Sequence, residues 1–247
     1  MKKLFTKAFL GVLAAGISTV AFAQEAAEAA APVEGGVHQA LKTKFIEGSA
    51  DFMSFVAIAL ILGLAFVLER IIYLNLADVN PNGMLNDIEA ALDRGDVDGA
   101  KAIARDTRGP IASIAYQGLM RIDQGIDVVE KSIVAYGGVQ SGLLEKNLSW
   151  ITLFIAMAPS LGFLGTVVGM IMAFDKIERV GDISPTVVAG GMKVALITTV
   201  GGLIVALILQ VFYNYLLSKL EAILNKMEDA SITLLDMVIK YNVKYKK

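Results

Sequence analysis

The residues of this chain that are best suited to chemistry are threonines inside long apolar segments, namely Thr166, Thr198 and Thr199. A hydroxyl both donates and accepts a hydrogen bond, so it can serve a protonatable group without burying a charge. The alternative for any one of them is a bond to the carbonyl four residues earlier in its own helix. No carboxylate accompanies them, because Lys193 is the only charged residue in the apolar stretch 187–217.

Small residues recur every four positions around these threonines. One apolar segment carries the rows Ala158–Gly162–Thr166 and Gly165–Gly169–Ala173, and the other carries Gly190–Val194–Thr198–Gly202 and Gly191–Ala195–Thr199. Small side chains let helix backbones approach closely in lipid, where apolar burial gives little net drive. The spacing predicts tight helix packing at Gly162, Gly165, Gly169 and Gly202. We expect this packing between subunits, and packing within one subunit is the alternative.

Three apolar segments are each long enough to cross about 30 Å of hydrocarbon as a helix. The predicted transmembrane helices are residues 51–77, 148–174 and 187–217. The chain is 55% hydrophobic and 19% charged, with a mean hydropathy of +0.62, which a soluble domain rarely shows. The predicted fold class is therefore an all-α integral membrane protein with three transmembrane helices, two of them long and extended into a cytoplasmic helical domain.

Composition excludes several classes of function. A formal net charge of −2 argues against a nucleic-acid partner, which needs a concentrated basic surface. The chain has no cysteine and a single histidine, so disulfides and Cys-ligated metals are excluded. No phosphate loop, metal-ligand cluster or nucleophile elbow is visible. We therefore expect no enzymatic activity and no bound cofactor, and we place any chemistry in the membrane.

The N-terminal segment, residues 1–23, has the pattern of a secretory signal peptide. A basic start precedes a short apolar core, and residues 21–23 fit a small-x-small cleavage site. The alternative is an anchor that is not cleaved. Export of this end makes residues 24–50 a periplasmic tether that leads into a short helix.

Topology follows from that exported end. Residues 78–147 and 218–247 are then cytoplasmic, and residues 175–186 form a periplasmic loop. The positive-inside rule mostly agrees, since several basic residues flank cytoplasmic ends of the spans: Arg70, Lys146, Lys219 and Lys226. Lys176 and Arg179 in the external loop oppose this bias.

The cytoplasmic region has the apolar period of helices. Met84, Ile88 and Leu92 lie at i, i+4 and i+8, and Gly95 ends that helix. Asp96 is predicted to N-cap the next helix, and Gly109-Pro110 begins a third. We expect these small helices, within residues 82–125, to pack against two long helices.

Both long helices are predicted to extend the membrane spans without interruption. Residues 126–150 lead directly into the second span. Residues 218–247 continue the third span as an amphipathic helix whose apolar positions are Leu220, Ile223, Leu224 and Met227.

Two charged positions near the spans are interpreted separately. Glu69 and Arg70, at the inner end of the first span, are predicted to be an interfacial anchor with both head groups in water. Lys193 lies about six residues, or about 9 Å, into the third span. Its long stem either snorkels to the outer headgroups or contributes to a ring of ammonium groups at the outer pore mouth.

The two threonine-bearing segments resemble a known family. "APSLGFLGTVVGMIMAF" (158–174) and "ALITTVGGLIVALILQVFYN" (195–214) resemble the signature spans of the MotA/TolQ/ExbB family of proton-channel motor subunits. "LERIIYL" (68–74) and "ALDRGDVDGAKAIARD" (91–106) also fit. Three spans with an external N-terminus resemble the ExbB and TolQ types more than the four-span MotA type, and the signal segment and tether resemble longer ExbB proteins.

The resemblance implies a multi-pass protein of the inner membrane that assembles as a homopentamer around a central pore. An ExbD-like dimer of single-span subunits would insert its helix into that pore, and proton flow would drive a TonB-like transducer of outer-membrane transport. The alternatives are a TolQ-type subunit for envelope integrity, or a structural membrane scaffold that conducts no ion. Sodium is the alternative coupling ion.

The family's pore threonines match Thr166 and Thr199. The candidate ion-pathway residues are Thr166, Thr198, Thr199, Lys193 and Val194. ExbB and TolQ proteins commonly carry a glutamate at the position of Val194 and a proline at the position of Gly190, so this chain departs from the pattern there. We therefore expect the titrating carboxylate to come from the partner's helix, within walls of small and hydroxyl-bearing residues supplied by this chain.

Overall fold

The computed structural model of the chain describes residues 37–181 and 185–245. The predicted signal segment (1–23) and most of the predicted tether lie outside the described residues. Helix α2 (Val37–Glu47) belongs to a first unit of the chain, and Lys44 and Glu47 form an ion pair of 2.9 Å on it. The remaining helices belong to a second unit, residues 48–247.

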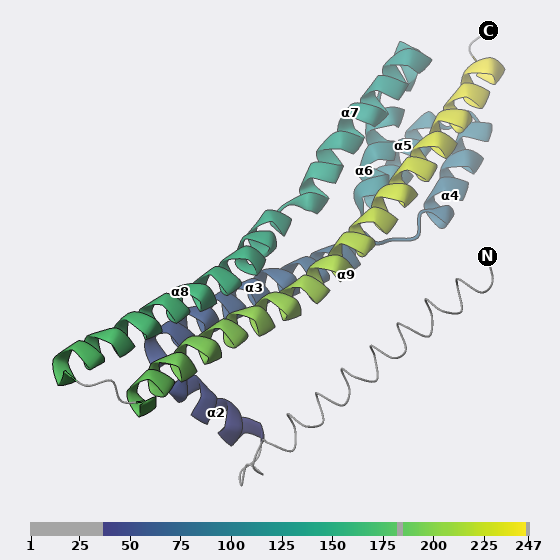
Figure 1. Cartoon of the computed structure of the whole chain (residues 1–247). Helices are drawn as coiled ribbons and strands as arrows, with labels where there is room; N and C mark the ends of the chain where they lie inside the picture. Colours follow the sequence, from purple (N-terminus) through teal and green to yellow (C-terminus); the bar gives the residue numbers. More distant parts are fainter. Residues whose placement is uncertain (1–36, 182–184, 246–247) are drawn as a thin grey trace, which may run out of the picture. The chain divides into compact units, whose positions relative to one another are not determined.

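Three long helices pack against one another in the second unit. They are α3 (Ala50–Ala77), α8 (Leu148–Val180) and α9 (Pro185–Tyr245), and each pair among them is in contact. Figure 1 shows α3, α8 and α9 running side by side. All three are long and apolar enough to cross a membrane. Every regular element in the described part of the chain is helical, so the predicted all-α, multi-pass membrane fold is confirmed.

The small helices are α4 (Asn82–Asp93), α5 (Val97–Asp106) and α6 (Pro110–Leu119), followed by the 3₁₀ turn η1 (Ile122–Gln124) and by α7 (Ile126–Glu145). The predicted end of the first of these helices at Gly95, and the predicted starts of α5 at Asp96 and of α6 at Gly109-Pro110, agree with these bounds. Asp96 caps α5, because its carboxylate accepts a 2.8 Å hydrogen bond from the Gly99 N–H. Gly95 follows α4 with a φ of 78°, which a residue with a side chain rarely adopts. Gly109 immediately precedes α6.

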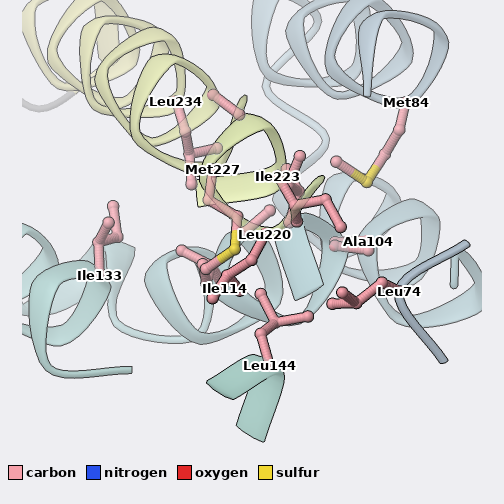
Figure 2. Packing of buried hydrophobic residues seen from close by; sticks show 14 of the residues in the cluster. Leu74, Met84, Ala104, Ile114, Ile133, Leu144, Leu220, Ile223, Met227 and Leu234 are labelled. Carbon is pink, nitrogen blue, oxygen red and sulfur yellow. The ribbon is translucent and has the colours of Figure 1, made fainter. Parts of the chain in front are cut away.

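Apolar side chains from most of these helices meet beside α9. Helices α4, α6 and α7 each contact α9. Figure 2 shows this cluster around the α9 residues Leu220, Ile223, Met227 and Leu234, joined by Leu74, Met84, Ala104, Ile114, Ile133 and Leu144. Leu220, Ile223 and Met227 are buried, as their helical spacing predicts. The part of α9 that extends beyond the third predicted span therefore serves as the core element on which the small helices pack.

The predicted continuity differs between the two long helices. Helix α9 is a single helix of 61 residues, so the prediction that the third span extends into the tail is confirmed. The corresponding prediction for the second span is wrong, because α7 ends at Glu145 and α8 begins at Leu148. Between them Asn147 has a φ of 67°, in the left-handed region that asparagine tolerates better than most residues. Helical period does not reveal such a two-residue break.

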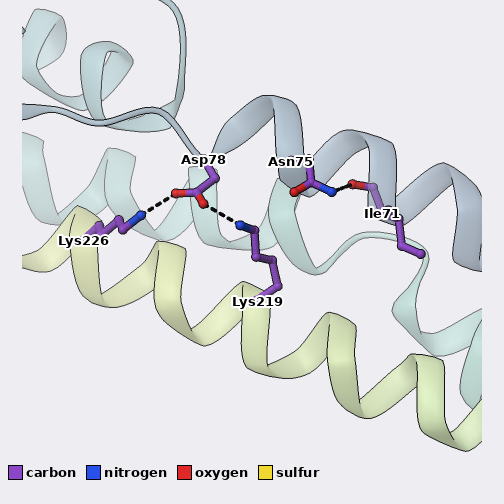
Figure 3. A network of polar contacts seen from close by, with 5 residues as sticks. All are labelled: Ile71, Asn75, Asp78, Lys219 and Lys226. Atoms are coloured by element: carbon purple, nitrogen blue, oxygen red, sulfur yellow. Dashed lines mark hydrogen bonds and ion pairs between the residues drawn. The ribbon is translucent and has the colours of Figure 1, made fainter.

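A carboxylate at the end of α3 ties the start of the small helices to α9. Asp78 accepts hydrogen bonds from Lys219 (2.5 Å) and Lys226 (2.6 Å), two turns apart on α9. Figure 3 shows both lysines reaching the same carboxylate, next to the Asn75 side chain, which bonds its own helix at the Ile71 carbonyl. The hydrogen bonds from Lys219, and then from Lys226, hold the pKa of Asp78 below its ordinary value.

Candidate functional site

Helices α8 and α9 pack so closely that several contact positions have room only for glycine. A Cβ added at Gly162 would lie 2.8 Å from the Thr198 carbonyl oxygen, and one added at Gly165 would lie 2.8 Å from the Thr198 Cβ. Both distances are below those that real Cβ atoms show. At Gly169 the nearest atom would be the Ala195 nitrogen, at 3.3 Å. Alanine at the first two positions would therefore push the helices apart.

The same close contact extends along both helices. A Cβ at Gly202 would meet the Ala158 carbonyl, and one at Gly191 would meet the Ala173 side chain. The small-residue spacing left open whether these rows pack within one subunit or between subunits, and we expected contacts between subunits. The structure places Gly162, Gly165, Gly169, Gly191 and Gly202 in the contact between α8 and α9 of one chain, whereas a Cβ added at Gly190 would meet nothing within 4 Å.

Thr166 and Thr199 meet at the edge of this contact. Their hydroxyl oxygens are within hydrogen-bonding distance of each other. Each also reaches carbonyls of both helices: Thr166 Oγ1 is 3.1 Å from the Ala195 oxygen and 3.3 Å from that of Gly162, and Thr199 Oγ1 is 3.2 Å and 3.4 Å from the same two oxygens. Each hydroxyl has only one proton, so these bonds are alternatives to one another. The pair is therefore a switchable hydrogen-bonding group that spans two helices.

Burial separates this pair from its neighbour Thr198. Thr166 and Thr199 are half-buried, whereas Thr198 is fully buried. The Thr198 hydroxyl donates within its own helix, at 2.9 Å from the Ala195 carbonyl and 3.2 Å from the Val194 carbonyl. Consecutive residues of a helix point about 100° apart, which turns one threonine into the helix contact and the next to its edge. Thr198 is thus a packing residue in this structure, although its type suggested an ion pathway.

The other two predicted pathway residues lie away from the threonine pair. Lys193 is exposed, and Val194 is half-buried. They precede Thr199 by six and five residues, which places them about 120° and about 140° around the helix axis from it. The structure therefore brings together Thr166 and Thr199 and leaves Lys193 and Val194 on other sides of α9.

A buried cation on α3 was interpreted incorrectly from the sequence. Arg70 is only 3% exposed, so its head group does not reach water as expected. Its guanidinium binds the Glu69 carboxylate through two nitrogens and lies 4.5 Å from the centre of the Tyr73 ring. Asn147, at the break between α7 and α8, donates to the same carboxylate at 3.4 Å. The sequence could have predicted the contact between Arg70 and Tyr73, because residues three positions apart are neighbours on a helix.

The charge distribution around the threonine pair is simple. Lys193 is the only charged residue of the apolar stretch 187–217 of α9. Within the described ranges, no group of three His, Cys, Asp or Glu residues is arranged to hold a metal ion. The pair can accept and donate hydrogen bonds, and the apolar stretches 148–174 and 187–217 that carry it contain no carboxylate.

Comparison with known proteins identifies a family to which this chain is similar. Residues 106–229, half of the chain, match the family described as the MotA/TolQ/ExbB proton channel family. This match includes both threonines, all of α8 and the part of α9 up to Asp229, and therefore the whole contact between the two helices described above.

Individual relatives carry related names. The chain is 28% identical over 169 residues to a putative biopolymer transport protein ExbB homolog of Methanothermobacter thermautotrophicus, covering 68% of this chain and 60% of that protein. It is 36% identical over 89 residues to the biopolymer transport protein exbB1 of Vibrio cholerae (33% of this chain, 39% of that protein). It is also 36% identical over 78 residues to the biopolymer transport protein ExbB of Aquifex aeolicus (32% and 53%). The matches thus span less than two thirds of each of these relatives.

Proposed function

Because this chain belongs to the MotA/TolQ/ExbB proton channel family, we propose that it is the multi-pass subunit of a proton-motive-force-driven motor of the ExbB–ExbD type. The motor would energise TonB-dependent transport across an outer membrane. The observation that carries this proposal is the hydroxyl pair Thr166–Thr199, held at the edge of a close contact between two apolar helices. The ExbB names of the relatives support this client system over the TolQ type.

The proposed mechanism uses an acid from the partner. A carboxylate at mid-bilayer costs about 2.5–3.5 kcal/mol when charged, and one elementary charge crossing 100 mV releases about 2.3 kcal/mol. The two energies are comparable, so protonation at this depth decides whether the partner's helix can move. The threonine pair would hydrogen-bond that carboxyl group in either protonation state, since each hydroxyl can donate or accept.

The assembly belongs to the same proposal. Five copies would surround a pore that holds the helices of an ExbD-like dimer, and a TonB-like transducer would receive the work. The protein would lie in the inner membrane, with its N-terminus in the periplasm and residues 78–147 and 218–247 in the cytoplasm. Protons are the proposed coupling ion. Hydroxyl and carbonyl oxygens would also suit sodium, so ion substitution belongs in the test.

The test compares adjacent threonines. Thr166→Val and Thr199→Val remove the hydroxyls at nearly constant volume, and Thr198→Val is the matched control because its hydroxyl bonds only its own helix. We expect all three variants to co-purify with the partner. We expect the first two to lose proton-driven uptake in cells that lack the native copy, while the control retains it.

Two results contradict this proposal. Uptake that is unimpaired in both valine variants would remove the role of the hydroxyl pair. Loss of uptake only together with loss of partner co-purification would favour the structural scaffold. Assays in sodium-free medium and at constant membrane potential separate proton from sodium coupling.

A further inference from the structure

A groove lies where α7 meets α8, against α9. Its volume is about 750 Å³. Its lining is mostly apolar, with Leu148, Leu153, Ala156, Leu217 and Leu220. The polar residues of the lining are Glu145 at the end of α7, Ser149 and Thr152 on the first turns of α8, and Tyr213 on α9. Glu145, Ser149 and Thr152 are exposed, and Tyr213 is half-buried.

The groove lies on the same side of the helix pair as the threonines. Thr152 precedes Thr166 by fourteen residues, and Tyr213 follows Thr199 by fourteen residues. Fourteen residues are close to four helical turns, about 21 Å, so each groove residue shares a face with its threonine. Because α8 and α9 run in opposite directions, Thr152 and Tyr213 lie toward the same end of the two helices. The groove therefore continues the line of contact that holds Thr166 and Thr199.

Hydrogen-bonding groups also lie between the groove and the pair Thr166–Thr199. Pro159 has no N–H and cannot donate the helical hydrogen bond to the Ile155 carbonyl. Ile155 precedes Thr166 by eleven residues, and Gln210 follows Thr199 by eleven, so both share the face of the threonine pair at about 16 Å from it. Gln210 is exposed, and its Nε2 donates to Asn214 at 3.4 Å, which leaves its amide oxygen to accept from water.

We propose that this groove is the hydrated exit of the coupling proton and that Glu145 is the carboxylate that receives it. The inference rests on the proposed function, including its orientation, in which this end faces the cytoplasm. A proton would pass from water in the groove to the Glu145 carboxylate and from there to bulk water, so the residue returns to its starting state. Thr152 donates to the Leu148 carbonyl at 3.2 Å, and its oxygen keeps lone pairs for groove water. Glu145 lies before the span begins, so its charge needs no costly burial.

Hydration of the groove can be tested without any conduction assay. The chain has no cysteine, so a single introduced thiol is the only one in this subunit. Thr152→Cys places a thiol in the groove, and Phe212→Cys places one on a different exposed face of α9, next in sequence to Tyr213. The probe is a water-soluble, membrane-impermeant thiol reagent added to inverted membrane vesicles that contain the full complex.

We expect the Thr152→Cys thiol to react at least about tenfold faster than the Phe212→Cys thiol, because the reactive thiolate forms only where water reaches it. Equal, slow rates would mean that lipid or a partner helix fills the groove, and would overturn the inference. Neither result depends on whether the complex conducts protons, so a dry groove leaves the proposed function standing.

The role of Glu145 is tested by proton flux into liposomes that contain the purified complex. We expect Glu145→Gln to lower the flux about tenfold or more, and Glu145→Asp to restore most of it, as for a group that transfers protons. Glu130→Gln, an exposed glutamate of α7 outside the groove, is the matched control and should match the native flux. If the flux is native in Glu145→Gln but reduced in Thr166→Val, the proposed role of Glu145 and the groove is wrong and the proposed function stands. Native flux in both variants overturns the proposed function as well.

Discussion

Gly165 of α8 faces the side chain of Thr198 of α9 so closely that an added Cβ would lie 2.8 Å from both the threonine Cβ and its hydroxyl oxygen. The next residue on each helix is the other half of the site, since Thr166 and Thr199 meet at the edge of the same contact. The hydroxyl pair therefore depends on glycine at position 165.

Gly165→Ala is expected to destabilise the contact between α8 and α9. Overpacking a close contact typically costs about 1–3 kcal/mol, and the threonine that would have to move is fully buried. Gly83→Ala on α4 is the control, because nothing lies within 4 Å of its added Cβ. Thermal unfolding of the detergent-solubilised protein measures both variants. A midpoint for Gly165→Ala as high as that of the control would show that the helices are less closely packed than described.

Arg70→Lys is expected to lower stability although it keeps the charge. Lysine lacks the planar fork that binds Glu69 through two nitrogens and lies over the Tyr73 ring. We expect a loss of about 1–2 kcal/mol, because Glu69 is partly exposed and water replaces some of the interaction. Arg105→Lys is the matched control, since Arg105 pairs with the adjacent Asp106 while both side chains are exposed. Equal unfolding midpoints for the two variants would contradict the burial of Arg70.

The ion pairs of Asp78 predict a dependence of stability on pH. Asp78 and Lys219 lie just outside the predicted spans. The pKa of Asp78 is lowered in the folded protein, so its contribution is present above the unfolded pKa of about 3.9 and is lost as the pH falls through the folded pKa. The hydrogen bond that Lys219 donates to Asp78 raises the pKa of Lys219, so that contribution persists at neutral pH and is lost only as the pH rises through the raised value.

Asp78→Asn should therefore unfold at a lower temperature than the native chain at neutral pH, and the difference should shrink on acidification. Scanning calorimetry at a series of pH values from about 7 to about 3 spans the ordinary aspartate pKa. Asp98→Asn is the control, because the Asp98 side chain is 95% exposed and its pair with Lys101 is 3.4 Å long. A difference between Asp78→Asn and the native chain that stays constant with pH would exclude the ion pairs as its source.

Lys193→Gln distinguishes the two interpretations of the lysine in the third span. The side chain is exposed and lies about 120° around α9 from Thr199, which favours a stem that reaches the headgroups over a ring that faces the threonines. We expect an unchanged ratio of partner to subunit after co-purification, measured by the mass of the intact complex. Loss of the partner would instead support a ring of ammonium groups that pairs with partner carboxylates.

Local features of this protein could be predicted from its residues alone. The lengths of the apolar segments gave the three long helices, and Asp96, Gly95 and Gly109-Pro110 gave the ends of the small helices. These features depend on residues within a few positions of one another, through caps, left-handed glycines and helical period. The threonines and glycines of the candidate site were found in the same way, as residue types repeated at fixed spacing.

The neighbour that each helix face meets depends instead on how the helices pack in three dimensions. Thr198 and Thr199 are adjacent and chemically identical, yet one is sealed against Gly165 and the other meets Thr166. The helical period of the sequence likewise did not show that the small-residue rows bring together two helices of one chain. It also did not show that Arg70 is buried or that α8 begins anew after Asn147. Helical period predicts which residues share one face of a helix. Whether that face is buried depends on a second helix that packs over it, and the second helix is distant in the sequence.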